Sequence, residues 1–236
     1  MKRIRKLYNS LADKYDFRHS NPTTLYLRDR ELSVLQKYAC GKILDIGCGT
    51  GYHLRFLDNV IGGDISEEML KRIRAGWKPV IQCDIENIPF KNGTFDTVIS
   101  MFSVLNVCNY RRAVREMARV CRVPGRIIIS VASVYDKFHL ALRERQKLRV
   151  TPHAQRKRLQ IEKKTVWLHL FTKDELVSLF SKYSFGLEHF ESLFFLINPR
   201  WGNFQEFSLK EKIKLLLERV LPFKDYGCMY IMVFRR

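Results

Sequence analysis

Long apolar runs are missing from this chain, and no stretch approaches the ~20 residues that a membrane-spanning helix needs. The basic N-terminus, Met1 to Lys6, leads into no apolar signal core. The six cysteines are dispersed: they contain no Cys-x-x-Cys pair, and no Cys/His cluster has the spacing of a zinc site. We therefore expect a reduced, cytoplasmic protein with no transmembrane segment and no structural metal.

Acidic residues are also scarce, because 24 Asp and Glu face 42 Lys and Arg and leave a net charge of +18. Such an excess does not specify a fold, but it favours contact with polyanions such as RNA, DNA or an anionic membrane surface. A generally basic, solvated surface is the alternative. With 236 residues, 46% of them hydrophobic, the chain is long enough for one domain, or one domain with a cap.

The most informative residues lie between Ile43 and Gly51. An apolar run leads into Asp45 and then into glycines spaced two apart, and a helix-like segment follows from Tyr52 to Leu57. This order predicts a buried parallel strand, a tight turn and a helix N-terminus. Glycine has no Cβ, so the backbone can come close to a ligand. We expect the turn to floor a cofactor pocket at the carboxyl end of the strand.

Two further apolar runs also end in an acid. The run Val60–Asp64 places Asp64 nineteen residues after Asp45, and Pro79–Ile85 contains Asp84. An acid about 20 residues beyond a glycine turn is where nucleotide-binding βαβ units hold a ribose diol. A carboxylate suits a diol because it accepts two hydrogen bonds and donates none.

The strands are expected near 42–46, 60–64, 79–83, 97–101 and 126–132, with helices between them, which predicts a doubly wound parallel α/β sheet. Before them, residues 24–38 carry Leu25, Leu32 and Leu35 at helical spacing. Capping boxes at Thr172 and Ser208 predict two later helices, the second ending near Val220. Strands follow near 186–191 and from Met229 to Phe234.

The Asp-x-Gly-x-Gly-x-Gly pattern resembles motif I of class I S-adenosylmethionine-dependent methyltransferases. The segment Pro89–Asp96 and the turn Arg119–Arg126 resemble the type-11 branch of that family, although Arg126 stands where the family has a second glycine. The resemblance covers residues 40 to 132 tightly. It implies a Rossmann-like seven-stranded sheet, mostly parallel with an antiparallel last strand, a helical cap, and S-adenosylmethionine as the cofactor.

The resemblance also implies functional residues. Asp64 would hold the ribose, Asp84 the adenine amine, and Ile85 would pack on the ring. The full set of expected cofactor-binding residues is Asp45, Gly47, Cys48, Gly49, Gly51, Asp64, Ile65, Asp84, Ile85 and Met101. His53 follows the glycine turn and could approach the amino acid end of the cofactor, but a position on a helix surface is the favoured interpretation.

The segment from Leu7 to Asp16 resembles a lid that folds over the cofactor in many type-11 members. We therefore divide the chain into an N-terminal helical lid, 1–40, and a methyltransferase domain, 41–236. Tyr15 would close on the methyl donor. Alternatively, Tyr8 and Tyr15 share one helix face and only dock that helix.

Methyl transfer from a sulfonium is an in-line displacement that mainly requires alignment. The stretch from Met101 to Cys108 should face the acceptor. Histidines that relatives often carry there are absent, and Asn106 and Val107 stand in their place. Tyr15 and Asn106 are the catalytic candidates, and a catalytic base is not identified. The missing Asn-Pro-Pro-Tyr motif argues against adenine-N6 or glutamine methylation.

A basic insert is expected at about 133–171. Between Lys137 and Lys164 it holds ten Lys or Arg against two acids, and Trp167 follows. Cations beside aromatic rings suit phosphate contacts and base stacking, whereas a solvated helical charge face is the competing interpretation. The candidate substrate-binding residues are Arg18, Arg156, Lys157, Arg158 and Trp167.

Several functions are compatible with these features. A methyltransferase acting on RNA, particularly tRNA, is favoured, because the motif order also resembles the tRNA wobble-uridine methyltransferases that esterify a carboxymethyl group. A small-molecule or lipid and quinone-precursor methyltransferase is the alternative, with the basic insert meeting an anionic surface. A non-catalytic partner protein is disfavoured because the cofactor motif is intact, and a nicotinamide dehydrogenase because of the glycine spacing. The acceptor atom and the oligomeric state are not specified.

Overall fold

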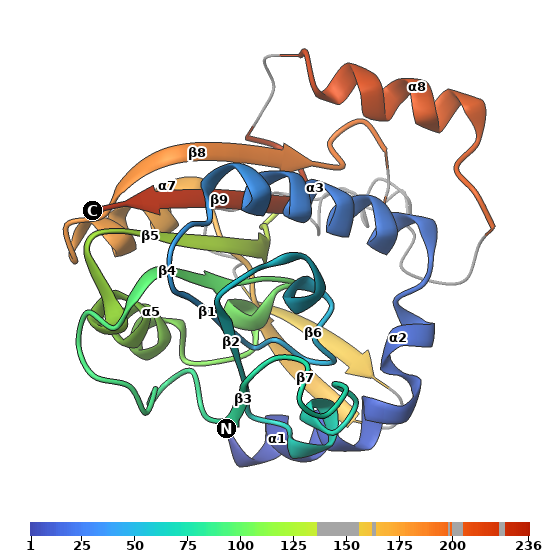
Figure 1. Ribbon diagram of the computed structural model, residues 1–236. Helices are drawn as coiled ribbons and strands as arrows, with labels where there is room; N and C mark the ends of the chain where they lie inside the picture. The colour runs from blue at the N-terminus through green and yellow to red at the C-terminus, as the bar shows by residue number, and fades with distance from the viewer. Residues whose placement is uncertain (136–155, 162–163, 198, 200–204, 222–224) are drawn as a thin grey trace.

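A seven-stranded sheet in the order β3-β2-β1-β4-β5-β9-β8 forms the centre of the computed structural model (Figure 1). The model describes residues 1–135, 156–161, 164–197, 199, 205–221 and 225–236. Strands β1 to β5 are mutually parallel, and β9 runs antiparallel to both β5 and β8. The predicted doubly wound sheet with an antiparallel last strand is confirmed. The strands are β1 Ile43–Ile46, β2 Val60–Asp64, β3 Val80–Gln82, β4 Phe95–Ser100, β5 Cys121–Ala132, β8 Gly186–Leu193 and β9 Met229–Arg235.

Helices cover both faces of this sheet, which explains why every residue of β1 is buried. Helices α5 (Tyr110–Val120) and α7 (Lys173–Ser181) pack on one face. Helix α3 (Pro22–Tyr38) packs on the other. The predicted cap at Thr172 is present as a hydrogen bond from the Glu175 amide to the Thr172 hydroxyl, which is one half of a capping box.

The buried face of α3 differs from the predicted face. Leu25 is exposed, whereas Leu27, Arg28, Glu31 and Leu35 are buried. The apolar spacing identified the helix correctly but not its orientation, because two charged side chains lie on the inner face and apolar periodicity cannot reveal them.

Helices between the strands are fewer and shorter than expected. The segment after the glycine turn is a 3-10 helix, η2 (His53–Phe56), and α4 (Glu67–Leu70) has only four residues, capped by the Ser66 hydroxyl. Within the described chain, no helix joins β3 to β4. Turns suffice there, and the Asp84 carboxylate stabilises one of them by accepting a hydrogen bond from the Glu86 amide.

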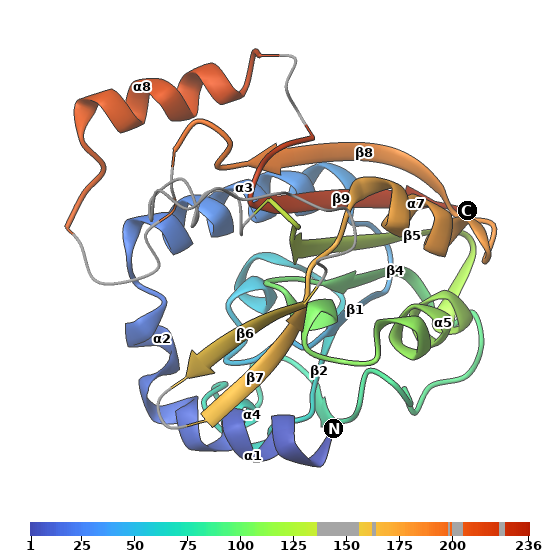
Figure 2. The same cartoon turned by 180° about the vertical axis from the view of Figure 1, so that it is seen from behind.

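The N-terminal segment lies across the carboxyl edge of the first strands. It consists of α1 (Lys2–Leu11), the 3-10 turn η1 (Ala12–Lys14) and α2 (Tyr15–Arg18). A separate antiparallel hairpin, β6 (Arg156–Ile161) and β7 (Lys164–His169), runs beside α1 (Figures 1 and 2). Leu7 and Leu11 of α1 pack with Val166 of β7 and Met69. The described part of the basic insert is therefore a β-hairpin and not a helical charge face; residues 136–155 lie outside the described part.

Helix α8 (Leu209–Glu218) lies apart from the helices that cover the sheet (Figure 1). Its predicted capping box is formed by Ser208 and Glu211. The buried Glu218 carboxylate accepts hydrogen bonds from the Phe194 and Leu196 amides and so fixes the helix to the chain after β8. Over the described residues, none of the helices has the length and apolarity to cross a membrane.

Candidate functional site

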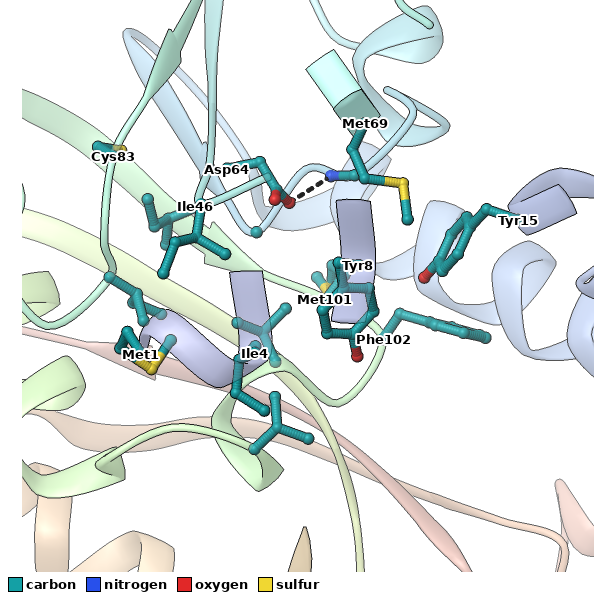
Figure 3. A pocket seen from close by; sticks show the side chains of 16 residues that line it. Met1, Ile4, Tyr8, Tyr15, Ile46, Asp64, Met69, Cys83, Met101 and Phe102 are labelled. Atoms are coloured by element: carbon teal, nitrogen blue, oxygen red, sulfur yellow. Dashed lines mark hydrogen bonds between the residues drawn. The ribbon is translucent and has the colours of Figure 1, made fainter. Parts of the chain in front are cut away.

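One cavity lies at the carboxyl ends of the first four strands, under the N-terminal helices (Figure 3). It measures about 60 Å³. Of the residues predicted from the sequence, it brings together Tyr15, Gly47, Gly49, Asp64, Ile65, Ile85 and Met101. This is the edge of a parallel sheet at which open α/β folds bind ligands.

Two glycines of the turn differ in the space beside their backbone: Gly47 has none for a side chain, whereas Gly49 faces open space. All three glycines of the turn have positive φ, 84° at Gly47, 55° at Gly49 and 80° at Gly51. A Cβ on Gly47 would collide with the side chain of Val104. A Cβ on Gly49 would meet only the ring of Tyr15, at 3.8 Å, so the backbone of Gly49 is bare toward the cavity. A ligand can approach the main chain there.

Among the described residues that line this cavity, Asp64 is the only one with a carboxylate side chain. One oxygen accepts a hydrogen bond from the Gly49 amide at 2.9 Å, and the other accepts from the Ser66 amide at 2.8 Å. Burial raises the pKa of this carboxyl, and the amide hydrogen bonds oppose that rise. Each carboxylate oxygen can accept a further hydrogen bond, so hydroxyl groups of a ligand can bind beside the turn.

The N-terminal helices close the cavity. Met1, Ile4 and Tyr8 of α1 line it together with Tyr15 of α2 (Figure 3). The two tyrosine rings lie on different helices with centroids 6.3 Å apart. Both line the cavity, and both also pack against the apolar cluster that docks α1. Burial, followed by the charge of Asp64, raises the pKa of Tyr8 to about 12, and burial also raises the pKa of Tyr15. The sequence analysis missed Met1 and Ile4, although their spacing to Tyr8 was the signal for one apolar helix face.

Four of the expected cofactor-binding residues do not line the cavity: Asp45, Cys48, Gly51 and Asp84. Asp45 is buried within β1, and its Oδ2 has no hydrogen-bond partner in the described chain. Burial is the largest cause that raises the pKa of its carboxyl to about 7. Burial also raises the pKa of the Cys48 thiol, which suits a packing role.

Asn106 joins the end of β5 to the end of β7. Its side-chain amide donates to the carbonyls of Ala132 and His169 at 2.9 and 2.5 Å and accepts from the Ala132 amide at 3.0 Å. The side chain is buried and does not line the cavity. The geometry therefore gives this catalytic candidate a structural role.

A buried polar group behind the glycine turn was not predicted. The Glu31 carboxylate accepts hydrogen bonds from the Phe102 amide and the Ser130 hydroxyl. His53 Nε2 lies 3.0 Å from Glu31 Oε2, at ion-pair distance but without the alignment of a hydrogen bond. The expectation that His53 lies on a helix surface is wrong, since only 6% of the residue is exposed. No local pattern signals this cluster, because its members come from α3, η2 and β5.

Of the candidate substrate residues, Arg18 and Trp167 do not line the cavity. Arg18 ends α2, and Trp167 on β7 is 60% exposed. Of Arg156, Lys157 and Arg158 the structure describes only the backbone in β6, where Arg158 pairs with Trp167 in the strand register. Next to Arg18, the His19 ring lies between Tyr15 and Phe102, and burial is the first cause that lowers its pKa to about 4.

Residues 44–129 match a family model described as a methyltransferase domain, of type 11. An uncharacterized protein of Methanocaldococcus jannaschii is 43% identical over 136 residues, which are 56% of this chain and 53% of that protein. A phosphatidylethanolamine N-methyltransferase of Cereibacter sphaeroides is 40% identical over 116 residues, 44% of this chain and 57% of that protein. The chain thus spans about half the length of the curated relatives it matches.

The fold is shared with a solved S-adenosylmethionine-dependent methyltransferase of Thermotoga maritima, with a TM-score of 0.63, 18% identity and 98% of both chains covered. The matched residues 44–129 contain the glycine turn and Asp64, and they form the part of the sheet that carries the cavity. Residues 44–129 thus match the type-11 methyltransferase domain, and the chain as a whole has the fold of a solved S-adenosylmethionine-dependent methyltransferase.

Proposed function

We propose that the chain is a methyltransferase that binds S-adenosylmethionine in the cavity beneath α1. One observation carries the proposal: the Asp64 carboxylate and the bare backbone of Gly49 meet at the carboxyl edge of four parallel strands. Asp64 would hold the ribose hydroxyls, since a carboxylate accepts two hydrogen bonds from a diol. Ile65, Ile85 and Met101 supply the apolar wall for the adenosyl group.

S-adenosylmethionine supplies an already activated methyl group on its sulfonium. The chain's own residues therefore have to position the acceptor against this methyl group and exclude water. Among the described lining residues, the titratable side chains besides Asp64 are those of Tyr8, Tyr15 and Cys83. Burial raises the pKa of all three side chains, so they stay neutral near neutral pH. This set suits an acceptor that needs no strong base, and it leaves alignment and exclusion of water as the main contributions.

The lid has to open for this function. Ligand pockets usually measure ~300–1,000 Å³, whereas the cavity measures about 60 Å³. Met1, Ile4 and Tyr8 of α1 line this space, and α1 is held by apolar contacts to Met69 and Val166. An outward movement of α1 would admit the cofactor, and its return would close the site from water.

For the acceptor we propose RNA, and the surface around the lid supports this choice. Lys2, Arg3 and Arg5 point outward from α1, and residues 1–12 contain no acid. The hairpin that packs on α1 adds the exposed Trp167 opposite Arg158. Cations beside an exposed aromatic ring, next to the site, suit phosphate contacts combined with base stacking. RNA methylation would agree with a cytoplasmic location.

Helix α8 favours a second candidate, an acceptor in a lipid bilayer. Leu209, Ile213, Leu216 and Val220 follow one helical face and are between 49% and 75% exposed. Lys210, Lys212 and Lys214 lie beside this apolar face. An exposed apolar face with flanking lysines is typical of helices that lie in a membrane interface. The similarity to a phosphatidylethanolamine N-methyltransferase is in keeping with such an acceptor.

One experiment separates the two acceptors. The protein is incubated with S-adenosylmethionine carrying a labelled methyl group and, in parallel, with total RNA or with vesicles made from total lipid extract. Label in RNA supports the first candidate, and label in lipid supports the second. Label in neither fraction contradicts both.

Two matched triple variants locate the docking surface. Replacing Arg156, Lys157 and Arg158 by alanine should flatten the salt dependence of RNA binding by roughly 0.7 per lost single-strand phosphate contact. Replacing Lys210, Lys212 and Lys214 by alanine removes the same charge from α8 and should leave RNA binding unchanged. A lipid acceptor predicts the reverse, with vesicle binding about 1 kcal/mol weaker per lysine removed.

A further inference from the structure

Arg28 is a buried cation for which the described part of the chain places no counter-charge. Only 6% of the residue is exposed. Its guanidinium carbon lies 4.0 Å from the ring centre of Tyr52 and 5.7 Å from that of Phe102. Within the described chain, the guanidinium has no hydrogen-bond acceptor and no carboxylate at ion-pair distance. Buried charges are normally paired, because an unpaired one has lost its hydration without compensation.

The neighbouring acid is already engaged. Glu31 lies one helical turn further along α3, but its carboxylate accepts from the Phe102 amide and the Ser130 hydroxyl and faces His53. The next arginine of the helix shows what a partnered side chain looks like, since Arg30 contacts the Glu191 carboxylate at 2.9 Å. Arg28 therefore differs from its helix neighbour in having no anion.

The position of Arg28 relates it to the cavity. Tyr52 directly follows the glycine turn, and Phe102 follows β4 and lines the cavity. The charge of Arg28 also acts on Tyr15, another lining residue, and lowers its pKa against the larger effect of burial. The guanidinium thus lies where the glycine turn, the end of β4 and the lid come together.

We propose that Arg28 binds the carboxylate at the amino acid end of S-adenosylmethionine. The inference rests on the proposed function, and it assigns the second end of the ligand: Asp64 takes the ribose, and Arg28 takes the carboxylate beyond the glycine turn. A guanidinium is always charged, and its planar fork matches a carboxylate with two parallel hydrogen bonds. The ligand would supply the anion that the protein itself does not place there.

A pair of ligands tests this assignment without any activity measurement. Decarboxylated S-adenosylmethionine lacks only the carboxylate, so calorimetry of both ligands on the wild-type protein isolates that group. We expect the decarboxylated ligand to bind roughly 10- to 100-fold more weakly, the scale of charge-assisted hydrogen bonds. Equal affinities for the two ligands would overturn the proposal before any variant is made.

The variant Arg28→Met completes the cycle, because methionine keeps the unbranched apolar stem and removes the charge. It should weaken S-adenosylmethionine by a similar factor and leave the decarboxylated ligand nearly unchanged. Arg30→Met, the same substitution two residues further along α3, is the matched control and should affect neither ligand. Equal weakening of both ligands by Arg28→Met would assign Arg28 to packing over Tyr52 and overturn the inference.

The two proposals fail in different ways. A wild-type protein that binds neither ligand would overturn the proposed function together with this inference. A wild-type protein that binds both ligands equally well would leave the proposed function intact and contradict only the assignment of Arg28 to the carboxylate.

Discussion

The buried acid of the glycine motif should make the protein less stable as the pH rises. Asp45 lies within β1, its Oδ2 has no hydrogen-bond partner in the described chain, and burial raises the pKa of its carboxyl from 3.8 to about 7. Because the folded pKa exceeds the unfolded one, the folded state binds more protons between these values. The stabilisation is complete below the unfolded pKa and is lost as the pH rises through the folded pKa.

The change Asp45→Asn removes the charge and keeps the shape of the side chain. A shift of roughly three pKa units corresponds to a loss on the order of 4 kcal/mol in the wild-type protein at alkaline pH. Burying the asparagine amide costs about 1 kcal/mol or more in return. Between about pH 5 and about pH 8, the stability of the variant relative to wild type should therefore increase by roughly 2–3 kcal/mol.

Urea unfolding followed by the fluorescence of the three tryptophans would measure this difference at both pH values. Asp58→Asn, at an exposed position after η2, is the control and should show the same relative stability at both. A relative stability of Asp45→Asn that stays constant with pH, or falls toward alkaline pH, would refute the electrostatic argument.

Three further substitutions test the site and its frame. Gly49→Val should abolish binding of S-adenosylmethionine in calorimetry. The control Gly76→Val, at a similar positive φ of 74° with open space around it, should lose a comparable ~1–2 kcal/mol of stability but keep binding. Binding by both variants would place the ligand elsewhere. Asp64→Ala should weaken binding by about 1–3 kcal/mol, with no binding of nicotinamide cofactors by any form, and an unchanged affinity in the folded variant would remove Asp64 from the site. Asn106→Ala should lower the free energy of unfolding by about 2–4 kcal/mol, because the Ala132 amide and the His169 carbonyl each lose a hydrogen bond; a smaller loss in urea unfolding would mean that water replaces the amide.

The parts of the site that the sequence predicted are those in which neighbours along the chain remain neighbours in space. Gly47 and Gly49 end one strand and Asp64 ends the next, and the carboxyl ends of parallel strands meet at one edge of a sheet. The meeting of the glycine turn with Asp64 therefore followed from local motifs. Met1 and Ile4 were missed because they are far in sequence from the strand ends that they approach in the folded structure.

The sequence did not predict that charged residues lie on the buried face of a helix. Arg28 and Glu31 carry charges, which are normally solvent-exposed, yet both lie on the inner face of α3. The error has a physical cause: their burial is stabilised by groups from β4, β5 and η2 that are 20 to 100 residues away, such as Tyr52 for Arg28 and Ser130 for Glu31. Asn106 was taken for a catalytic candidate for the same reason, since its partner Ala132 is 26 residues away.

The sequence by itself determined the parallel sheet, the glycine turn and the acid at the end of β2. Each depends on short-range properties: apolar patterning, the positive φ that glycine tolerates, and the length of a βαβ unit. Only the tertiary structure decided which residues close the cavity, that the described insert is a hairpin packed on α1, and that Arg28 lies beside the turn without a counter-charge. These features depend on packing between distant segments, and burial there changes what a charged side chain does without changing its local sequence.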